Sequence, residues 1–213
     1  MKTLVFDLDG TLVNTIYDIG SSMNQSLKEH GFNEHPLDEY YNFIGQGVIV
    51  LTKKSIGNND VSEEILYSVL NRYNEIYSQN STVLSKPYEN MVDVLDSLIN
   101  KGYRLAVISN KPDADTKRII KYYFGDRFEY VYGWKNEVNR KPDKMAMDIM
   151  MRELSLDIND IIYIGDSRYD AEFAINSGCD YYLFEYGYEN KEVLYSYKPL
   201  HFLSKANDLL KYF

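Results

Sequence analysis

The sequence predicts an α/β fold in which a parallel sheet is covered by helices on both faces, with an all-helical unit inserted after the first strand. Short apolar runs alternate with segments of helical period over most of the chain, which is typical of such a sheet. The stretch 15–85 carries helical patterns but no convincing strand. A crossover between parallel strands needs far fewer residues, so this stretch is predicted to form a separate unit.

Four apolar runs are the main strand candidates, and a weaker fifth accompanies them. They are rich in β-branched or aromatic residues and lack strict alternation with polar residues, as expected for strands buried on both faces. The four runs are Leu4 to Leu8, Tyr103 to Ser109, Ile161 to Gly165 and Tyr181 to Phe184, and the fifth is Glu129 to Gly133. Such strands place functional groups at their carboxyl ends.

Apolar residues between these strands repeat with helical spacing. One face runs from Met91 to Ile99 and is followed by Gly102 as a stop signal, and similar faces cover 119–124 and 147–154. Inside the insertion, helices are expected at 16–29, 37–44, 48–55 and 63–77. Pro87 is predicted to begin the next helix and to mark the return to the sheet. The predicted division is therefore 1–14 with 86–213, and 15–85.

Composition and charge exclude several classes of protein. The 213 residues carry a net charge of −9, which repels the phosphate backbone and argues against nucleic acid as a partner. No apolar run reaches the roughly 18 residues that a membrane helix needs. The single cysteine and an acidic residue by position 7 lead us to expect a cytoplasmic protein without a membrane partner.

Two carboxylates, Asp7 and Asp9, follow the first predicted strand, and Gly10 and Thr11 come next. Side chains alternate along an extended chain, so Asp7 and Asp9 are expected to project to the same side. Neighbouring carboxylates repel each other unless a cation lies between them or one holds a proton. Mg²⁺, which prefers one or two carboxylates with phosphate and water, suits the pair. Gly10 allows a tight turn whose amides, including that of Thr11, face an anion.

Further polar residues follow the later strands. Ser109 and Asn110 precede a helix, where they can form a small anion site, although an ordinary helix cap also accounts for such a serine. Lys141 lies in a basic run that suits either a phosphoryl oxygen or a solvated helix entrance. Asp166 follows the Ile161 strand, where it suits a metal site or a cap, and Asp170 lies one helical turn later. Because all these groups fall at strand-to-helix junctions on one sheet edge, together they predict a metal-assisted phosphoryl site.

These motifs resemble, in order, the four motifs of the haloacid dehalogenase-like hydrolase superfamily. The inserted helices resemble its cap domain, and the rest resembles its Rossmann-like catalytic core. Within the superfamily the chain is most similar to the phosphoglycolate phosphatase-like branch, whose Gly-x-Gly turn resembles Ile44-Gly45-Gln46-Gly47 and whose Tyr-Gly ending resembles Tyr186-Gly187-Tyr188. We expect Gly45, Gln46 and Gly47 to contact the substrate.

The resemblance also implies a role for each catalytic residue. Asp7 would attack phosphorus and form an aspartyl-phosphate, which water then hydrolyses. Asp9 would protonate the leaving oxygen and later activate water. Lys141 would balance the charge of Asp7 and of the phosphoryl oxygens.

The phosphate and metal ligands are implied in the same way. Ser109 and Asn110 would hold the phosphoryl oxygens. Mg²⁺, the expected cofactor, would be bound by Asp7, by the backbone carbonyl of Asp9 and by Asp166, with Asp170 as a further ligand or as support for one.

Several functions remain open at this point. Dehalogenases of the superfamily lack an acid at the position of Asp9, so this residue favours hydrolysis of a small phosphomonoester resembling phosphoglycolate. The alternatives are a sugar-phosphate mutase of β-phosphoglucomutase type, a pyrophosphatase, a 5′-nucleotidase, and a non-enzymatic phosphate-sensing domain resembling bacterial receivers. The expected partner is a small phosphorylated metabolite, and the expected assembly is a monomer or a weak homodimer.

Overall fold

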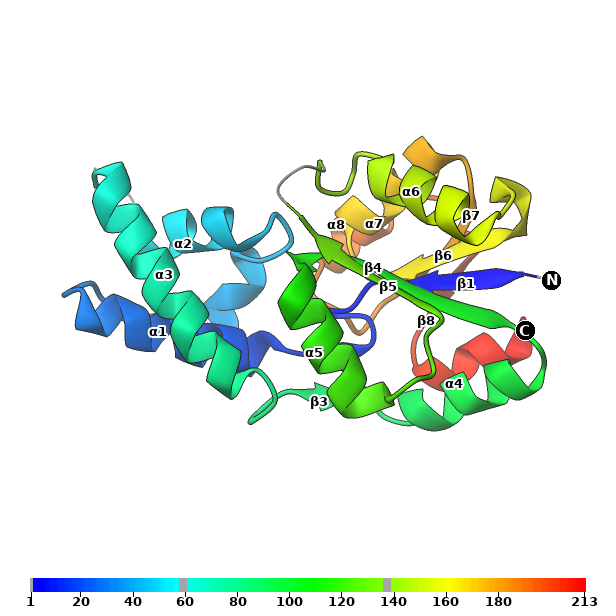
Figure 1. Ribbon diagram of the computed structural model, residues 1–213, viewed down its shortest axis with the longest axis horizontal. Helices are drawn as coiled ribbons and strands as arrows, with labels where there is room; N and C mark the ends of the chain where they lie inside the picture. The colour runs from blue at the N-terminus through cyan, green and yellow to red at the C-terminus, as the bar shows by residue number, and fades with distance from the viewer. Residues whose placement is uncertain (1, 58–60, 136–138) are drawn as a thin grey trace. The chain divides into compact units, whose positions relative to one another are not determined.

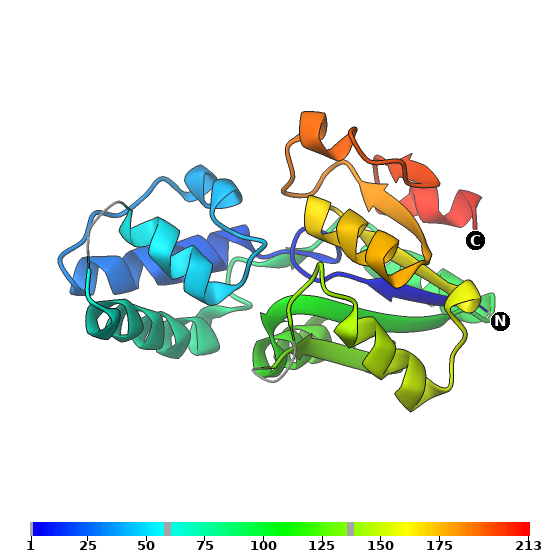
Figure 2. The same ribbon diagram turned by 90° about the horizontal axis from the view of Figure 1, so that it is seen from above.

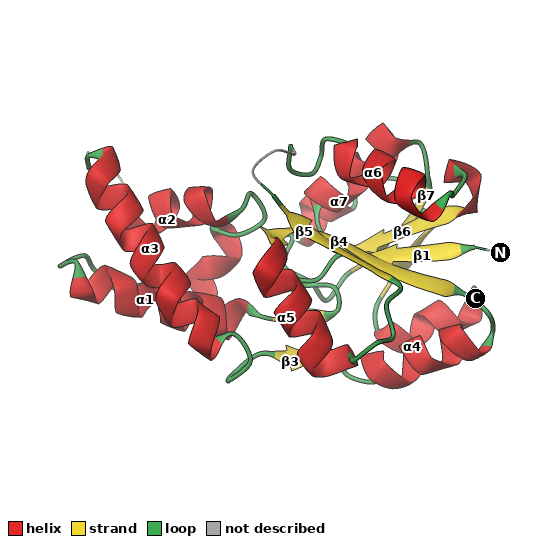
Figure 3. Cartoon of the chain, viewed as in Figure 1, coloured by secondary structure: helices red, strands yellow, loops and turns green. Residues whose placement is uncertain are grey.

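The computed structural model describes residues 2–57, 61–135 and 139–213, which form two units. The first combines the residues up to Asn14 with Pro87–Phe213, and the second is Thr15–Lys86. The first unit is built on a six-stranded sheet with helices above and below it (Figure 1, Figure 3). The fold class predicted from the sequence is therefore confirmed.

All strand pairs of this sheet are parallel, and the order is β5-β4-β1-β6-β7-β8. The central strand β1 (Thr3–Phe6) is wholly buried, because both its faces and both its edges are covered. Its last residue, Phe6, aligns with Val107 of one neighbour and Ile164 of the other, so β1 ends its pairing with both neighbours at the same level. The remaining strands are β4 (Arg104–Pro112), β5 (Tyr130–Trp134), β6 (Ile161–Gly165), β7 (Asp180–Phe184) and β8 (His201–Leu203).

Helices cover the two faces of the sheet in pairs. On one face lie α4 (Met91–Asn100) and α5 (Asp113–Phe124), and on the other α6 (Met145–Leu154) and α7 (Arg168–Ser177) (Figure 3). Because side chains alternate along β1, its residues pack on both faces of the sheet. The Phe6 ring contacts Phe128, which contacts Phe124, whereas Val5 packs in the cluster of the other face. Shorter elements are η2 (Ile158–Asp160), α8 (Lys191–Leu194) and η3 (Ala206–Lys211).

The second unit is all-helical. It contains α1 (Ile16–Glu29), η1 (Leu37–Asn42), α2 (Val48–Ile56) and α3 (Glu63–Asn80). Helices α1 and α3 lie side by side, with α2 packed against both (Figure 2). A hydrogen bond from the Ser26 hydroxyl to the Val69 carbonyl and an ion pair between Arg72 and Glu29 join the two long helices.

Where the chain passes between the units, β2 (Val13–Asn14) pairs with β3 (Lys86–Pro87). The prediction that Pro87 begins a helix is wrong. Pro87 ends β3, and α4 begins only at Met91, after Asn90 adopts the left-handed conformation at φ 61°. Just before β3, Asp18 accepts hydrogen bonds from the amides of Leu84 and Ser85.

Two smaller differences concern short elements. The segment expected as a helix over 37–44 is a 3-10 helix ending at Asn42. Strand β8 was not predicted, because three residues are too few to show a periodic pattern. Among the described residues, no helix has both the length and the apolar character needed to cross a membrane.

Candidate active site

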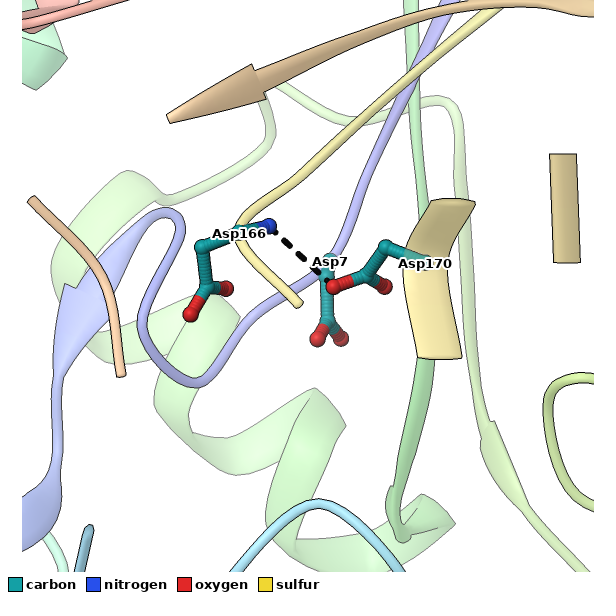
Figure 4. A group of neighbouring side chains, drawn as sticks. All are labelled: Asp7, Asp166 and Asp170. Atoms are coloured by element: carbon teal, nitrogen blue, oxygen red, sulfur yellow. Dashed lines mark hydrogen bonds between the residues drawn. The ribbon is translucent and has the colours of Figure 1, made fainter. Parts of the chain in front are cut away.

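Three buried aspartates meet at the carboxyl edge of the sheet. Asp7 follows β1, Asp166 follows β6, and Asp170 lies in the first turn of α7 (Figure 4). One carboxylate oxygen from each lies within 4.8 Å of the others. Because β1 and β6 are neighbouring parallel strands, their acids reach the same point without any further adjustment.

The backbone of Asp7 is fixed by a hydrogen bond, and its side chain lies among other charged groups. Its amide donates to the Ile164 carbonyl at 2.9 Å. Its Oδ1 lies 3.0 Å from Lys141 Nζ but accepts no well-aligned hydrogen bond from the described residues. Burial raises the pKa of Asp7 to about 6 against the attraction of Lys141, and the charges of Asp170 and Asp9 add to the rise.

The Lys141 ammonium lies in a closed polar cage, and its side chain is 2% exposed. It donates to Asp170 Oδ1 at 2.7 Å and to the Tyr163 hydroxyl at 2.9 Å, and it also reaches the Ile108 carbonyl at 3.3 Å. Burial opposes its charge, but Asp170 and Asp7 outweigh that effect and raise the pKa of Lys141. A lysine placed in this way carries a fixed positive charge beside Asp7.

Asp170 is saturated with hydrogen bonds. Its Oδ1 faces Lys141, and its Oδ2 accepts from the amides of Asp166 and Ser167 and from the Ser167 hydroxyl. The pair Ser167 and Asp170 forms a capping box that begins α7. Although burial opposes it, Lys141 holds the pKa of Asp170 below its usual value. Asp170 therefore orients both Lys141 and the loop that carries Asp166.

Two hydrogen bonds hold the Asp166 carboxylate. Thr11 Oγ1 donates to its Oδ1 at 2.6 Å, and the Tyr188 amide donates to its Oδ2 at 2.8 Å. Burial, with the charges of Asp170 and Asp7, raises the pKa of Asp166 well above its usual value. The amides of Gly10 and Thr11 donate within the turn, to the carbonyls of Val13 and Leu8. These bonds give the turn a role in holding Asp166, and its contact with phosphate stays a prediction.

Gly187 closes the cradle of Asp166. A Cβ at this position would lie 2.2 Å from Asp166 Cβ and 2.3 Å from its Oδ2, so Gly187→Ala must displace Asp166. We expect a loss of about 10- to 100-fold in Mg²⁺ affinity, measured as the Mg²⁺ concentration for half-maximal turnover. Gly178→Ala is the control, because its Cβ would have nothing within 4 Å and the strain at φ 78° lies at the far end of α7. Equal Mg²⁺ affinities for the two variants would contradict the expectation.

Asp9 is paired with a residue that the sequence analysis did not single out. Lys111 Nζ lies 2.9 Å from Asp9 Oδ1 and 3.0 Å from its Oδ2. The side chain of Lys111 is 5% exposed and that of Asp9 is 20% exposed. The Asp9 carboxylate thus faces the end of β4.

Ser109 and Asn110 occupy the end of β4. The buried Ser109 hydroxyl accepts from the Lys111 amide at 3.3 Å. The Asn110 side chain accepts from the Lys141 amide at 2.7 Å and donates to the Lys141 carbonyl at 3.1 Å. Asn110 thereby holds the backbone of Lys141, and the predicted contacts of both residues with phosphate stay predictions.

Comparison with known proteins assigns the family. The model of the haloacid dehalogenase-like hydrolase family matches residues 4–184. The chain belongs to this family. The expectation that it is an enzyme is therefore confirmed.

Relatives of this hydrolase match it along nearly its whole length. The phosphoglycolate phosphatase of Cereibacter sphaeroides is 32% identical over 197 residues, covering 91% of this chain and 89% of that protein. The phosphoglycolate phosphatase of Aliivibrio fischeri is 26% identical, covering 93% and 90%. The crystal structure of a predicted phosphoglycolate phosphatase from Haemophilus somnus superposes with a TM-score of 0.93 at 27% identity, covering 100% and 97%.

The aspartate cluster fits the divalent cation on which hydrolases of this family generally depend. Asp7, Asp166 and Asp170 would together bring three negative charges, and Lys141 is the cation in contact with two of them. Two buried charges are left to be offset, which matches one divalent ion, and carboxylate oxygens are the ligands that Mg²⁺ prefers. The buried Asp7 Oδ1 accepts no hydrogen bond from the described residues and can therefore serve as a metal ligand.

Some contacts that support the site carry no local sequence signal. Tyr163 contacts Lys141, and Thr11, which was expected to face an anion, donates to Asp166. Lys111 did carry one, because it lies two residues after Ser109 and therefore on the same side of an extended strand. Gly45 and Gly47 adopt positive φ in the turn before α2, in the helical unit.

Proposed function

We propose that this hydrolase is a magnesium-dependent phosphatase that cleaves a small phosphomonoester through an aspartyl-phosphate on Asp7. The observation that carries the proposal is the contact of Asp7 with Lys141 beside Asp166 and Asp170, just after β1 and two residues before Asp9. A carboxylate nucleophile, a fixed cation and an acidic metal site are the parts that phosphoryl transfer requires.

The reaction proceeds in two displacements. An Asp7 carboxylate oxygen attacks phosphorus while the bond to the leaving oxygen breaks, and Asp9 donates a proton to that oxygen, so that the alcohol departs. Asp9 then takes a proton from water, whose oxygen attacks phosphorus and displaces the Asp7 carboxylate. Inorganic phosphate is released, and both aspartates return to their starting states.

The remaining residues hold charge in place. Lys141 neutralises the charge of Asp7 and of the phosphoryl oxygens. Asp170 orients Lys141 through an ion pair and Asp166 through a hydrogen bond from its amide. Ser109 and Asn110, with Gly10 and Thr11, border the phosphoryl group. Mg²⁺ held by Asp7, Asp166 and the Asp9 carbonyl, with Asp170 as ligand or support, would supply the positive charge that offsets the transferring group.

The substrate class is a small phosphomonoester, with phosphoglycolate as the leading candidate. Support comes from the relatives named phosphoglycolate phosphatase, which match over about nine-tenths of the chain. We further propose that Gly45, Gln46 and Gly47 contribute to substrate selection from the helical unit. The two glycines supply positive φ at a turn, and Gln46 is exposed there.

The proposal is tested by ranking small phosphate esters by kcat/KM with Mg²⁺. The panel holds phosphoglycolate, glucose 6-phosphate, β-glucose 1-phosphate, pyrophosphate and a nucleoside 5′-monophosphate. We expect phosphate release to be highest with phosphoglycolate and to fall to background when EDTA removes the metal.

Two outcomes would contradict the proposal in different ways. Interconversion of the glucose phosphates without phosphate release would indicate a mutase. A higher kcat/KM for pyrophosphate or the nucleotide would retain the phosphatase mechanism and replace the substrate. Full turnover in EDTA would remove the metal from the mechanism.

A further inference from the structure

The ion pair between Lys111 and Asp9 joins two segments that are far apart in the sequence but adjacent in the sheet. Strands β1 and β4 are parallel neighbours, and Phe6 aligns with Val107. Asp9 lies three residues beyond Phe6, and Lys111 four residues beyond Val107. Both residues therefore lie just past the last aligned residues of neighbouring strands, at the edge where the site lies.

The lysine backbone is fixed independently of the ion pair. Its amide donates to Ser109 Oγ at 3.3 Å, and its carbonyl accepts from Thr116 Oγ1 in α5 at 3.1 Å. The side chain then extends from a rigid strand end into a nearly closed environment. A buried ammonium needs a compensating charge, and among the bonds described here Asp9 supplies it with both oxygens.

Contact with both oxygens constrains Asp9 more than a single contact would. An ammonium within 3.0 Å of both oxygens ties the whole carboxylate group to Lys111, so the direction in which Asp9 points is set by the lysine. A proton donor works only within hydrogen-bond reach of the atom that it protonates, and a misplacement of about 1 Å can cost roughly 10²-fold in rate.

We propose that Lys111 is a positioning residue that holds Asp9 in the orientation needed for proton transfer to and from the reacting oxygen. The inference rests on the proposed function, in which Asp9 performs that transfer. The two lysines then have different roles: Lys141 neutralises the nucleophile Asp7, and Lys111 orients the acid Asp9.

A double-mutant cycle tests the proposal. Lys111→Met and Lys111→Arg are prepared alone and in the Asp9→Asn background, and kcat is measured with a phosphate ester of an alcohol of high pKa and with p-nitrophenyl phosphate. Asp9→Asn should reduce kcat for the alkyl ester by about 10²- to 10⁴-fold, and much less for p-nitrophenyl phosphate, whose leaving group needs no proton.

Lys111→Met alone should reduce kcat for the alkyl ester by about 10- to 100-fold with a smaller change in KM. It should cause little further loss in the Asp9→Asn background, because Lys111 acts through Asp9. Lys111→Arg, which keeps a cation able to contact two oxygens, should recover part of the loss. Thermal unfolding of each variant checks that it is folded.

The failures are distinguishable. If Lys111→Met costs the same factor with and without Asp9, or the same factor with both leaving groups, Lys111 acts directly on phosphate or on the fold, and the positioning role is wrong while the phosphatase function stands. If Asp9→Asn affects both leaving groups equally, the acid role fails and the positioning role fails with it. A wild-type chain that hydrolyses neither ester refutes the proposed function itself.

Discussion

Replacing Asp7 by asparagine is expected to reduce turnover by about 10⁴-fold or more, because in the proposed mechanism Asp7 forms the covalent intermediate. Asparagine keeps the size of the side chain and removes the nucleophilic oxygen. Asp7 is buried, and its backbone is fixed to β6 through Ile164, so the substitution should leave the fold intact. The measurement is steady-state phosphate release, combined with acid-quench trapping of phosphorylated protein from a labelled substrate.

The control for this experiment is Asp126→Asn. Its side chain is 90% exposed and, among the described residues, forms an ion pair with the exposed Lys121, so its removal should change neither turnover nor the trapped phosphoprotein. Turnover by Asp7→Asn within tenfold of the wild type, or a phosphoprotein that persists in the variant, would mean that Asp7 is not the nucleophile.

Replacing Lys141 by methionine is expected to remove both activity and stability. The change takes the cation away from Asp7 and Asp170, whose carboxylates are 13% and 0% exposed. Leaving one side of a buried ion pair without its partner costs about 3–5 kcal/mol, which corresponds to a fall of roughly 6–20 °C in Tm for a chain of this length. Calorimetry and turnover assays of the same preparation measure the two effects.

Two further variants separate the cause. Lys144→Met removes a lysine that is 57% exposed and 3.6 Å from Asp148, and it should shift the Tm by about 2 °C or less. Adding Asp170→Asn to Lys141→Met should recover part of the lost Tm, since it removes one stranded charge, but it should recover no activity. A Lys141→Met protein as stable as the wild type would show that the buried pair contributes nothing to the folded state.

The two lysines of the site differ in how much the sequence predicted about them. Lys141 was identified through its place in an ordered set of motifs, and the structure brings it to 3.0 Å from Asp7. Lys111 lies two residues after Ser109 in β4, which places it on the same side of the strand, but this spacing does not say which group it contacts. Its pairing with Asp9 became visible only when β1 and β4 were placed next to each other in register.

The hydrogen bonds of Asn110 and Asp170 could not be predicted from the sequence either. Residue type and position placed both at the site, but only their hydrogen bonds show that Asn110 holds the Lys141 backbone and that Asp170 orients Lys141 and the Asp166 loop. Similarly, Pro87 was expected to begin a helix. The pairing of β3 with β2 overrides that local preference, because strand hydrogen bonds are set by a partner distant in the chain.

The sequence by itself determined the α/β class, the helical insertion and the set of acids at the strand ends, because hydrophobic periodicity and residue type are written locally along the chain. The tertiary structure alone decided which charges meet. The neighbouring strands β1 and β4 brought Lys111 to Asp9, and the segment before α6 brought Lys141 to Asp7 and Asp170. The loop after β7 brought Gly187 and Tyr188 against Asp166. Such contacts arise between segments roughly a hundred residues apart in the first case, and no local pattern encodes a distance across the sheet.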